Sequence, residues 1–176
     1  MKINPRFVTL ILIMFPILKC FASVPNEVTL DGIAYFKADQ NDMGNHKSAE
    51  YLQKGETLSN WTSKFAIHYY MNEKNPVEFA KGKSGDASNI VLIDDNKNNI
   101  IQTFDTIVPV NDVGGPYIFQ QNVWRYEKLN FDKGIISIEY STRKSVPSQT
   151  APAALQGVDP KIQNDMKSME IDRFEF

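Results

Sequence analysis

The feature that most constrains the fold is an alternation of apolar and polar residues with a period of two. It is clearest from Trp61 to Tyr69, where mainly apolar side chains occupy every second position and Thr62, Lys64 and His68 lie among the intervening ones. Successive side chains of a β-strand point to opposite faces of a sheet. The segment therefore predicts a strand with one buried face.

Turn residues divide the rest of the alternation into further strands. Residues 28–36 predict a first strand, and residues 90–93 and 100–108 flank a polar Asp/Asn turn. Residues 123–129 and 135–142 enclose a Phe-Asp-Lys-Gly turn, which indicates the clearest hairpin in the chain.

Aromatic and β-branched residues of this last hairpin predict the core. Trp124 and Tyr126 share one strand face, and Ile136, Ile138 and Tyr140 share a face of the other strand. We expect the two sets to face the same core and to supply most of it.

Two segments carry helix signals. Pro76 suits the first position of a short helix over residues 77–83. Asp159 and Pro160 begin a second helix, in which residues 162, 166 and 169 form an apolar stripe. Residues 145–158 are rich in Pro, Ala, Ser and Gln and predict a flexible loop, and residues 170–176 alternate as in a final strand.

These elements predict an α+β fold with a single curved antiparallel sheet and two or three helices packed on it. No repeat or second domain interrupts the pattern, so residues 23–176 are interpreted as one domain. A chain of this length buries enough surface to fold without disulfides.

The first 22 residues predict an export signal. Lys2 and Arg6 precede an apolar run over residues 7–18, which is too short for a membrane span, and Ala22 offers a small residue for cleavage. We expect a mature protein that starts near Ser23 and resides in the bacterial periplasm or outside the cell. Lipid modification of Cys20 and an uncleaved anchor are the alternatives.

Cleavage would change the charge and the chemistry of the chain. Three of the 19 cations and none of the 21 anions lie in residues 1–22, so the mature chain has 16 cations against 21 anions, a net charge of −5. This acidic balance argues against nucleic acid as a partner. The mature chain would hold no cysteine and no transmembrane segment.

A Gly-Glu-x-Leu-x-x-Trp segment at residues 55–61 carries a family resemblance. With a Pro-x-Glu-Phe-Ala helix and a Trp-Arg-Tyr strand after it, it resembles a group of small exported bacterial proteins without an assigned activity. The order of elements is similar to the PsbP/Mog1 fold. That resemblance implies an accessory or binding role and brings no catalytic residues. From the residues alone, Gly55 would permit a turn, Leu58 would fill the core and Trp61 would anchor a strand.

Four residues are candidates for contact with a ligand or partner, namely Trp61, Tyr69, Trp124 and Arg125. Both tryptophans also suit a purely structural role, and tryptophan is common at interfaces. Arg125 and Arg143 would form an anion site if their strands were neighbours, although outward cations on strands are usually solvated.

The turn from Asp94 to Asp105 resembles a calcium loop. Asp94, Asn96, Asn98 and Asp105 occupy positions 1, 3, 5 and 12 of an EF-hand-like pattern of oxygen ligands. Position 6 is Asn99 in place of glycine, and strands flank the loop in place of helices. A polar hairpin turn accounts for the same residues, so no metal site is favoured and no cofactor is expected.

Histidine and serine give little support for catalysis. We interpret His46 as part of a polar loop, His68 as a strand residue, and the pair as a poor zinc set. No serine lies in a Gly-x-Ser-x-Gly segment. The sequence therefore favours a non-enzymatic binding or accessory protein with an unknown protein or small-molecule partner in the cell envelope. The alternative is a hydrolase, which requires a histidine, a serine and a carboxylate to meet in a cleft.

Overall fold

The computed structural model describes residues 24–84, 89–92, 98–110, 116–130, 133–147, 159–171, 174 and 176. Within these residues one antiparallel sheet has eight strands in the order β1-β2-β3-β4-β8-β7-β6-β5. The strands are β1 (Glu27–Leu30), β2 (Ile33–Asp42), β3 (His46–Leu52), β4 (Ser63–Tyr70), β5 (Asn89–Leu92), β6 (Asn99–Pro109), β7 (Tyr117–Lys128) and β8 (Ile135–Val146). The helices are α1 (Pro76–Ser84) and α2 (Pro160–Ser168). The fold is α+β and mostly sheet, as predicted.

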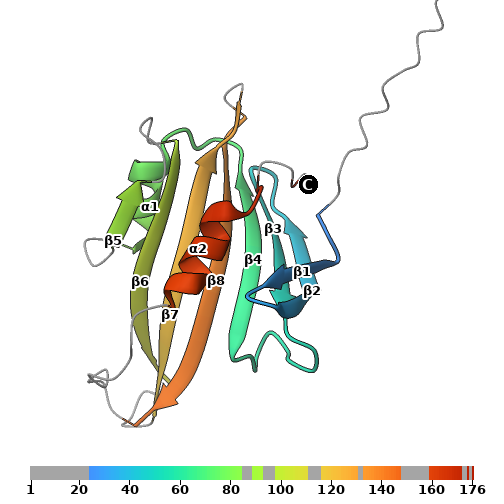
Figure 1. Ribbon diagram of the computed structural model, residues 1–176, viewed down its shortest axis with the longest axis vertical. Coiled ribbons are helices and arrows are strands. Elements are labelled where there is room, and N and C mark those ends of the chain that lie inside the picture. Colours follow the sequence, from blue (N-terminus) through green and yellow to red (C-terminus); the bar gives the residue numbers. More distant parts are fainter. Residues whose placement is uncertain are drawn as a thin grey trace, which may run out of the picture.

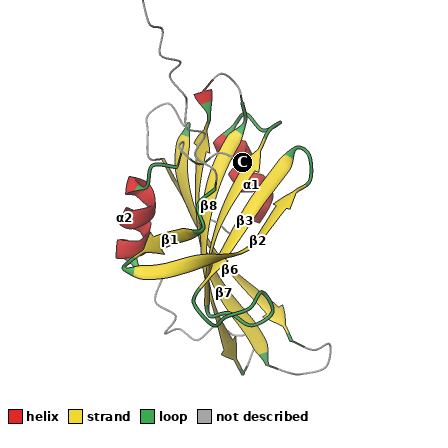
Figure 2. Ribbon diagram, turned by 90° about the vertical axis from the view of Figure 1, so that its right-hand side faces the viewer, coloured by secondary structure: helices red, strands yellow, loops and turns green. Residues whose placement is uncertain are grey.

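The two helices lie on opposite faces of the sheet, which is long and curved (Figures 1 and 2). Helix α1 packs against β6 and β7, and α2 packs against β1 and β7. We call the two sides the α1 face and the α2 face. Because both faces carry a helix, the central strands bury side chains on both faces of the sheet.

The two faces hold separate apolar cores. The α2-face core contains Phe65, Ile67, Ile136, Ile138, Ile162 and Met166 among its buried residues. A smaller α1-face core contains Ala80, Ile100, Tyr126 and Ile135. The expectation that Trp124 and Tyr126 share a core with Ile136, Ile138 and Tyr140 is wrong. Trp124 pairs with Glu139 and Tyr126 with Ser137 across the β7–β8 ladder, so the two predicted sets lie on opposite faces.

Both helices begin at the signals that predict them. Asn75 Oδ1 accepts hydrogen bonds from the backbone N–H groups of residues 77 and 78, and Pro76 opens α1. Asp159 Oδ1 accepts from Lys161 N at 2.8 Å, and Pro160 follows it as the first residue of α2. An N-cap and a proline at the first position satisfy or remove the free N–H groups of a helix start.

Several predicted boundaries are wrong for local reasons. Residues 28–36 form two strands, since Asp31 and Gly32 take positive φ angles of 51° and 74° and turn β1 into β2. Strand β3 was not predicted. Strand β8 continues to Val146, so the predicted loop at 145–158 starts within a strand, and residues 148–158 lie outside the described part. Of residues 170–176, the four that are described do not lie in a strand.

Strand β4 alternates as predicted, but it is not half-buried. Phe65 and Ile67 are fully buried on the α2 face, and Ala66 (0 % exposed) and His68 (8 %) are buried on the α1 face. The charged and polar side chains on the α1 face of this strand were expected to be exposed to solvent, but they are enclosed.

Candidate functional site

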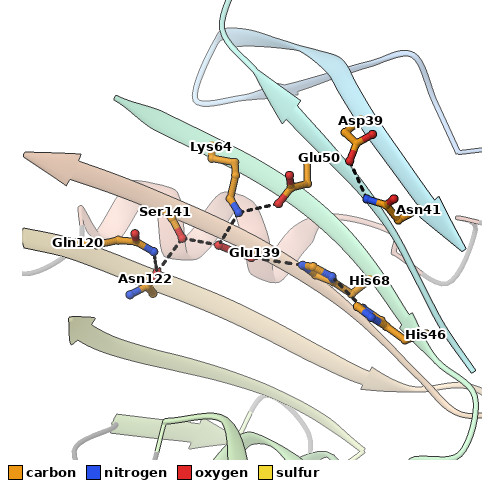
Figure 3. A network of polar contacts seen from close by, with 10 residues as sticks. All are labelled: Asp39, Asn41, His46, Glu50, Lys64, His68, Gln120, Asn122, Glu139 and Ser141. Atoms are coloured by element: carbon orange, nitrogen blue, oxygen red, sulfur yellow. Dashed lines mark hydrogen bonds and ion pairs between the residues drawn. The ribbon is translucent and has the colours of Figure 1, made fainter. Parts of the chain in front are cut away.

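A continuous set of polar side chains crosses the α1 face over β3, β4 and β8 (Figure 3). Lys64 Nζ lies 2.9 Å from Glu50 Oε1 and 3.5 Å from Glu139 Oε1. Glu139 Oε2 lies 3.3 Å from His68 Nε2, and His68 Nδ1 lies 3.3 Å from His46 Nε2. We call these five residues the polar row. It joins the consecutive strands β3 and β4 to β8, whose Glu139 lies 71 residues after His68.

Glu139 is the buried anion at the centre of the polar row. Its side chain is 6 % exposed and accepts a hydrogen bond from Ser141 Oγ at 2.7 Å. Burial acts to raise its pKa, but the hydrogen bond from His68 and the charge of Lys64 outweigh burial and lower the pKa to about 2. Glu139 is thus ionised at neutral pH and acts as an acceptor.

Lys64 is the complementary cation. Burial acts to lower its pKa, but the carboxylates of Glu139 and Glu50 outweigh burial and raise the pKa. Its ammonium also lies 5.6 Å from the centroid of the Trp61 ring. A buried charge is tolerated when it is paired and hydrogen-bonded, and here each charge of the pair supports the other.

The two histidines lie end to end. Their ring centroids are 5.5 Å apart, their facing nitrogens are 3.3 Å apart, and their planes differ by 17°. An ionised carboxylate only accepts hydrogen bonds, so the Glu139 contact requires a hydrogen on His68 Nε2. In the neutral form of the pair, His68 Nδ1 then carries a lone pair, to which His46 Nε2–H donates.

Aromatic rings enclose this end of the polar row. His46 stacks on Tyr70 with centroids 4.5 Å apart and planes within 1°, and His68 stacks on Trp124 at 5.2 Å and 7°. Tyr70 contacts Phe79 of α1, and the Lys83 ammonium lies 4.9 Å from the Tyr70 ring centroid. The stack holds both imidazoles in place between β3, β7 and α1.

Two buried polar atoms on the α1 face have no hydrogen-bond partner within the described residues. They are Trp124 Nε1 and Ser137 Oγ. Ser137 is fully buried and pairs across the ladder with both His68 and Tyr126. An unsatisfied buried polar group costs about 1–3 kcal/mol, so these atoms mark a place where water or a ligand would be stabilising.

The histidine pair alone is too small a ligand set for zinc, which is bound by three or four protein ligands. The facing nitrogens lie 3.3 Å apart, which is close to the spacing of two nitrogens on one tetrahedral zinc ion. Within the described residues, no group of three or more His, Cys, Asp or Glu side chains is arranged to hold a metal ion.

Of the four residues predicted to contact a ligand, the structure places Trp124 on the α1 face in direct contact with the polar row. Trp61 is 8 % exposed, and the Arg143 guanidinium and the Lys64 ammonium lie 4.4 Å and 5.6 Å from its ring centroid. Tyr69 is half-buried and donates from its hydroxyl to the Lys133 carbonyl at 2.7 Å. Trp61 and Tyr69 therefore make well-defined structural contacts.

Arg125 is a structural residue that closes α2 onto the sheet. It is 5 % exposed, and its Nη1 donates to the carbonyls of Met166, Lys167 and Met169 at 2.6–3.0 Å. Its Nη2 lies 2.7 Å from Glu127 Oε2. These carbonyls end α2 and lack helical partners, so Arg125 satisfies them.

Arg125 and Arg143 do not form a shared anion site. Their strands are neighbours, but Arg125 pairs with Ile138 and Arg143 with Gln120, which places the two side chains on opposite faces. Arg143 instead donates from Nη2 to the Ser59 carbonyl at 2.8 Å and from Nε to the Trp61 carbonyl.

The residues of the calcium pattern do not lie close together, because β6 carries Asp105 away from the turn. Asp94 and Asn96 lie outside the described residues, and the described backbone confirms the β5–β6 hairpin. Asp105 lies six residues into β6, about 20 Å along the strand from the turn. Asn98 and Asp105 therefore cannot belong to one calcium loop.

The segment at residues 55–61 is a clamped loop between β3 and β4. Gly55 has a φ of 90°, and the Glu56 carboxylate accepts from Thr62 N at 2.8 Å and Thr62 Oγ1 at 2.5 Å. Leu58 is 45 % exposed, so the prediction that it fills the core is wrong. The turn at Gly55 and the anchoring of Trp61 are as expected.

Most contacts of the polar row were not predicted from the sequence. His46 is not in a loop, since it is the first residue of β3. Lys64 and Glu139 were unremarkable as residues on the polar side of a strand. A usable signal was present in the alternation of Ser137, Glu139 and Ser141 opposite three apolar residues in a hairpin next to β4.

The order of groups differs from a hydrolase triad. Glu139 lies between Ser141 and His68 and accepts a hydrogen bond from each. The second nitrogen of His68 faces His46. In a serine hydrolase the histidine contacts the serine directly and takes its proton, whereas here the serine hydroxyl is bound by an ionised carboxylate.

Comparison with known proteins gives a family and no function. A family model of uncharacterised proteins matches residues 22–171. The chain belongs to this family. Searches of the curated proteins and of the solved structures return no significant match. In the described residues, neither helix has the length and apolar character needed to cross a membrane.

Proposed function

We propose that this family member is an exported, non-enzymatic binding or accessory protein that uses the α1 face around Trp124 to engage its partner. The observation that carries the proposal is the state of Trp124. Its ring is only half-buried, it lies flat on His68, and its buried Nε1 has no acceptor within the described residues. A tryptophan with an accessible surface and an unused donor is suited to act as a binding anchor.

The neighbouring groups give the surface its chemistry. Phe104 lies 6.5 Å from Trp124 and is also half-buried, and Tyr126 stacks on the other side at 5.7 Å. Ionised Glu139 pairs with Trp124 across the β7–β8 ladder, and the Lys64 ammonium lies 3.5 Å from the Glu139 carboxylate. A partner with an apolar or aromatic group and a hydrogen-bond acceptor would complement this surface.

Export is supported by the first 22 residues and by the start of the family match at residue 22. N-terminal sequencing of the protein from a periplasmic or secreted fraction should give a chain that begins at Ser23. A chain retained in the cytoplasm with Met1 or its first residues intact would overturn the export proposal. A membrane-bound chain that begins with acylated Cys20 would identify a lipoprotein and overturn the soluble form.

Binding is tested by quantitative affinity purification from the native envelope fraction. The mature protein should recover one stoichiometric partner, and Trp124→Leu should reduce recovery at least about 10-fold, as expected for an interface anchor. Leu58→Ser is the matched control, because Leu58 is an exposed apolar residue of the loop between β3 and β4 and is not among the aromatic residues around Trp124. Equal recovery by the Trp124→Leu and Leu58→Ser variants would contradict the assignment of the α1 face.

A further inference from the structure

At the His46 end of the polar row, the contact between the two imidazole rings depends on how many protons they carry. Glu139 accepts from His68 Nε2–H, and His68 Nδ1 accepts from His46 Nε2–H, so a line of hydrogen bonds runs from a buried carboxylate to a half-exposed ring. The remaining nitrogen of His46, Nδ1, is outside this line.

We propose that the His46–His68 pair is an acid-operated latch, which keeps the His46 ring on the α1 face until the pair takes up a second proton. One added proton leaves the contact intact, because one facing nitrogen still offers a lone pair to the N–H group of the other. The resulting single positive charge is balanced by Glu139. After a second proton is bound, both facing nitrogens carry a hydrogen.

The doubly protonated pair cannot keep its geometry. Two N–H groups would point at each other across 3.3 Å, in rings that lie end to end. His68 is 8 % exposed and is held by Glu139 and Trp124, whereas His46 is half-exposed at the first position of β3. The His46 side chain is therefore the one that leaves.

Charged groups from the surrounding elements set the acidity at which this occurs. Around the pair, the titratable side chains are Glu50 on β3, Lys64 and Tyr70 on β4, Tyr126 on β7, Glu139 on β8 and Lys83 on α1. On β2, Asp42 is paired with Lys47 at 3.1 Å. Burial, His68 and Lys83 all lower the pKa of His46 below its ordinary value of 6.5.

Departure of the His46 ring would uncover one face of Tyr70. The backbone would stay, because Met43 N donates to the His46 carbonyl and Met71 N to the Asn45 carbonyl, both at 2.9 Å. The newly exposed Tyr70 adjoins Phe79 and Lys83 of α1. Acid would thus enlarge the aromatic surface of the α1 face without unfolding the sheet. The latch needs no partner, so it does not depend on the binding or export proposed above.

The test is an NMR titration of the mature protein between pH 8 and pH 4.5. The chain has two histidines, so a single substitution assigns both imidazole signals. We expect two separate protonation steps for the pair, with loss of the nuclear Overhauser contact between His46 and Tyr70 at the lower step. The latch would be overturned if each ring titrated with a single step that the other ring does not affect. It would also be overturned if the His46–Tyr70 contact persisted after both rings are protonated.

Two variants sharpen the test. Lys83→Gln removes a repelling cation and should move the lower step to higher pH, by roughly half a unit at low salt. Lys47→Gln is the matched control, since Lys47 is next to His46 in sequence but lies on the opposite face.

In His46→Phe, an aromatic ring remains available for Tyr70 and His68 should titrate in one step. If this variant does not fold, the wild-type titration and Lys83→Gln still decide the question, and equal shifts for both lysine variants would contradict the proposed geometry.

Discussion

Replacing Arg125 with methionine should detach the end of α2 from the sheet. Arg125 makes five hydrogen bonds, three of them to the carbonyls of Met166, Lys167 and Met169. At about 1 kcal/mol net for each bond, the sum is about 5 kcal/mol. Partial release of α2 would let its carbonyls bind water, so we expect the free energy of unfolding to fall by about 3 kcal/mol, at the lower end for breaking a buried ion pair.

Urea unfolding of the wild type and the Arg125→Met variant measures this loss, and hydrogen exchange of the α2 amides shows where it occurs. Lys161→Met is the control on the same helix. Its ammonium pairs with Asp31 and Asp165 at an exposed position, and exposed pairs contribute little. A loss below about 1 kcal/mol for Arg125→Met, or α2 amides as protected as in the wild type, would refute the reasoning.

Three further predictions concern single residues. Gly134→Ala should lower the melting temperature more than Gly44→Ala does. A Cβ at Gly134 would lie 2.2 Å from the Tyr70 carbonyl oxygen, whereas a Cβ at Gly44 would have nothing within 4 Å. Equal shifts in melting temperature would contradict this reasoning. The lowered pKa of Glu139 contributes stability above pH 4.5 that is lost as the pH falls towards 2, so a Glu139→Gln variant should show a flatter dependence of unfolding free energy on pH in that window. Asp159→Ala should cost about 1 kcal/mol in urea unfolding through loss of the α2 N-cap, and an unchanged midpoint would argue against that cap.

Elements with strong local signals were predictable from sequence. The β7–β8 hairpin and both helices depend on turn and cap residues close to the element itself, such as Asn75 and Asp159. Their physical cause is local satisfaction of backbone N–H groups. The same is true of β1 and β2, where Asp31-Gly32 is a two-residue turn with both φ angles positive. That hairpin signal was readable, and it was missed because residues 28–36 also alternate as one strand.

Strand β3 could not be recognised by apolar periodicity. Three of its alternate residues, His46, Ser48 and Glu50, point to the α1 face, and such polar letters are typical of a loop or a solvated strand. Their partners are supplied by β4, where Lys64 pairs with Glu50 and His68 meets His46. The strand is specified by contacts to residues 14 to 22 positions away, which a local pattern does not contain.

The assignment of faces failed for a related reason. Periodicity separates the two faces within one strand, but it does not say which faces of neighbouring strands coincide. The register that sets Trp124 opposite Glu139, and not opposite an isoleucine, decides this. With a helix on each face, both sets are buried, so an apolar face no longer identifies a single core.

The polar row illustrates what a polar strand face can mean. Lys64, His68 and Glu139 were compatible with a solvated surface, since alternating strands usually expose such residues to water. The structure encloses them because aromatic rings from β4, β7 and α1 cover the same face. Burial acts to raise the pKa of Glu139, and the hydrogen bond from His68 and the charge of Lys64 outweigh it and keep that pKa low. Burial of a charged row is expensive unless every member is paired. The charged members of this face are all paired, whereas Trp124 Nε1 and Ser137 Oγ have no hydrogen-bond partner within the described residues. The proposed binding role rests on this difference between the paired charges and the half-exposed Trp124.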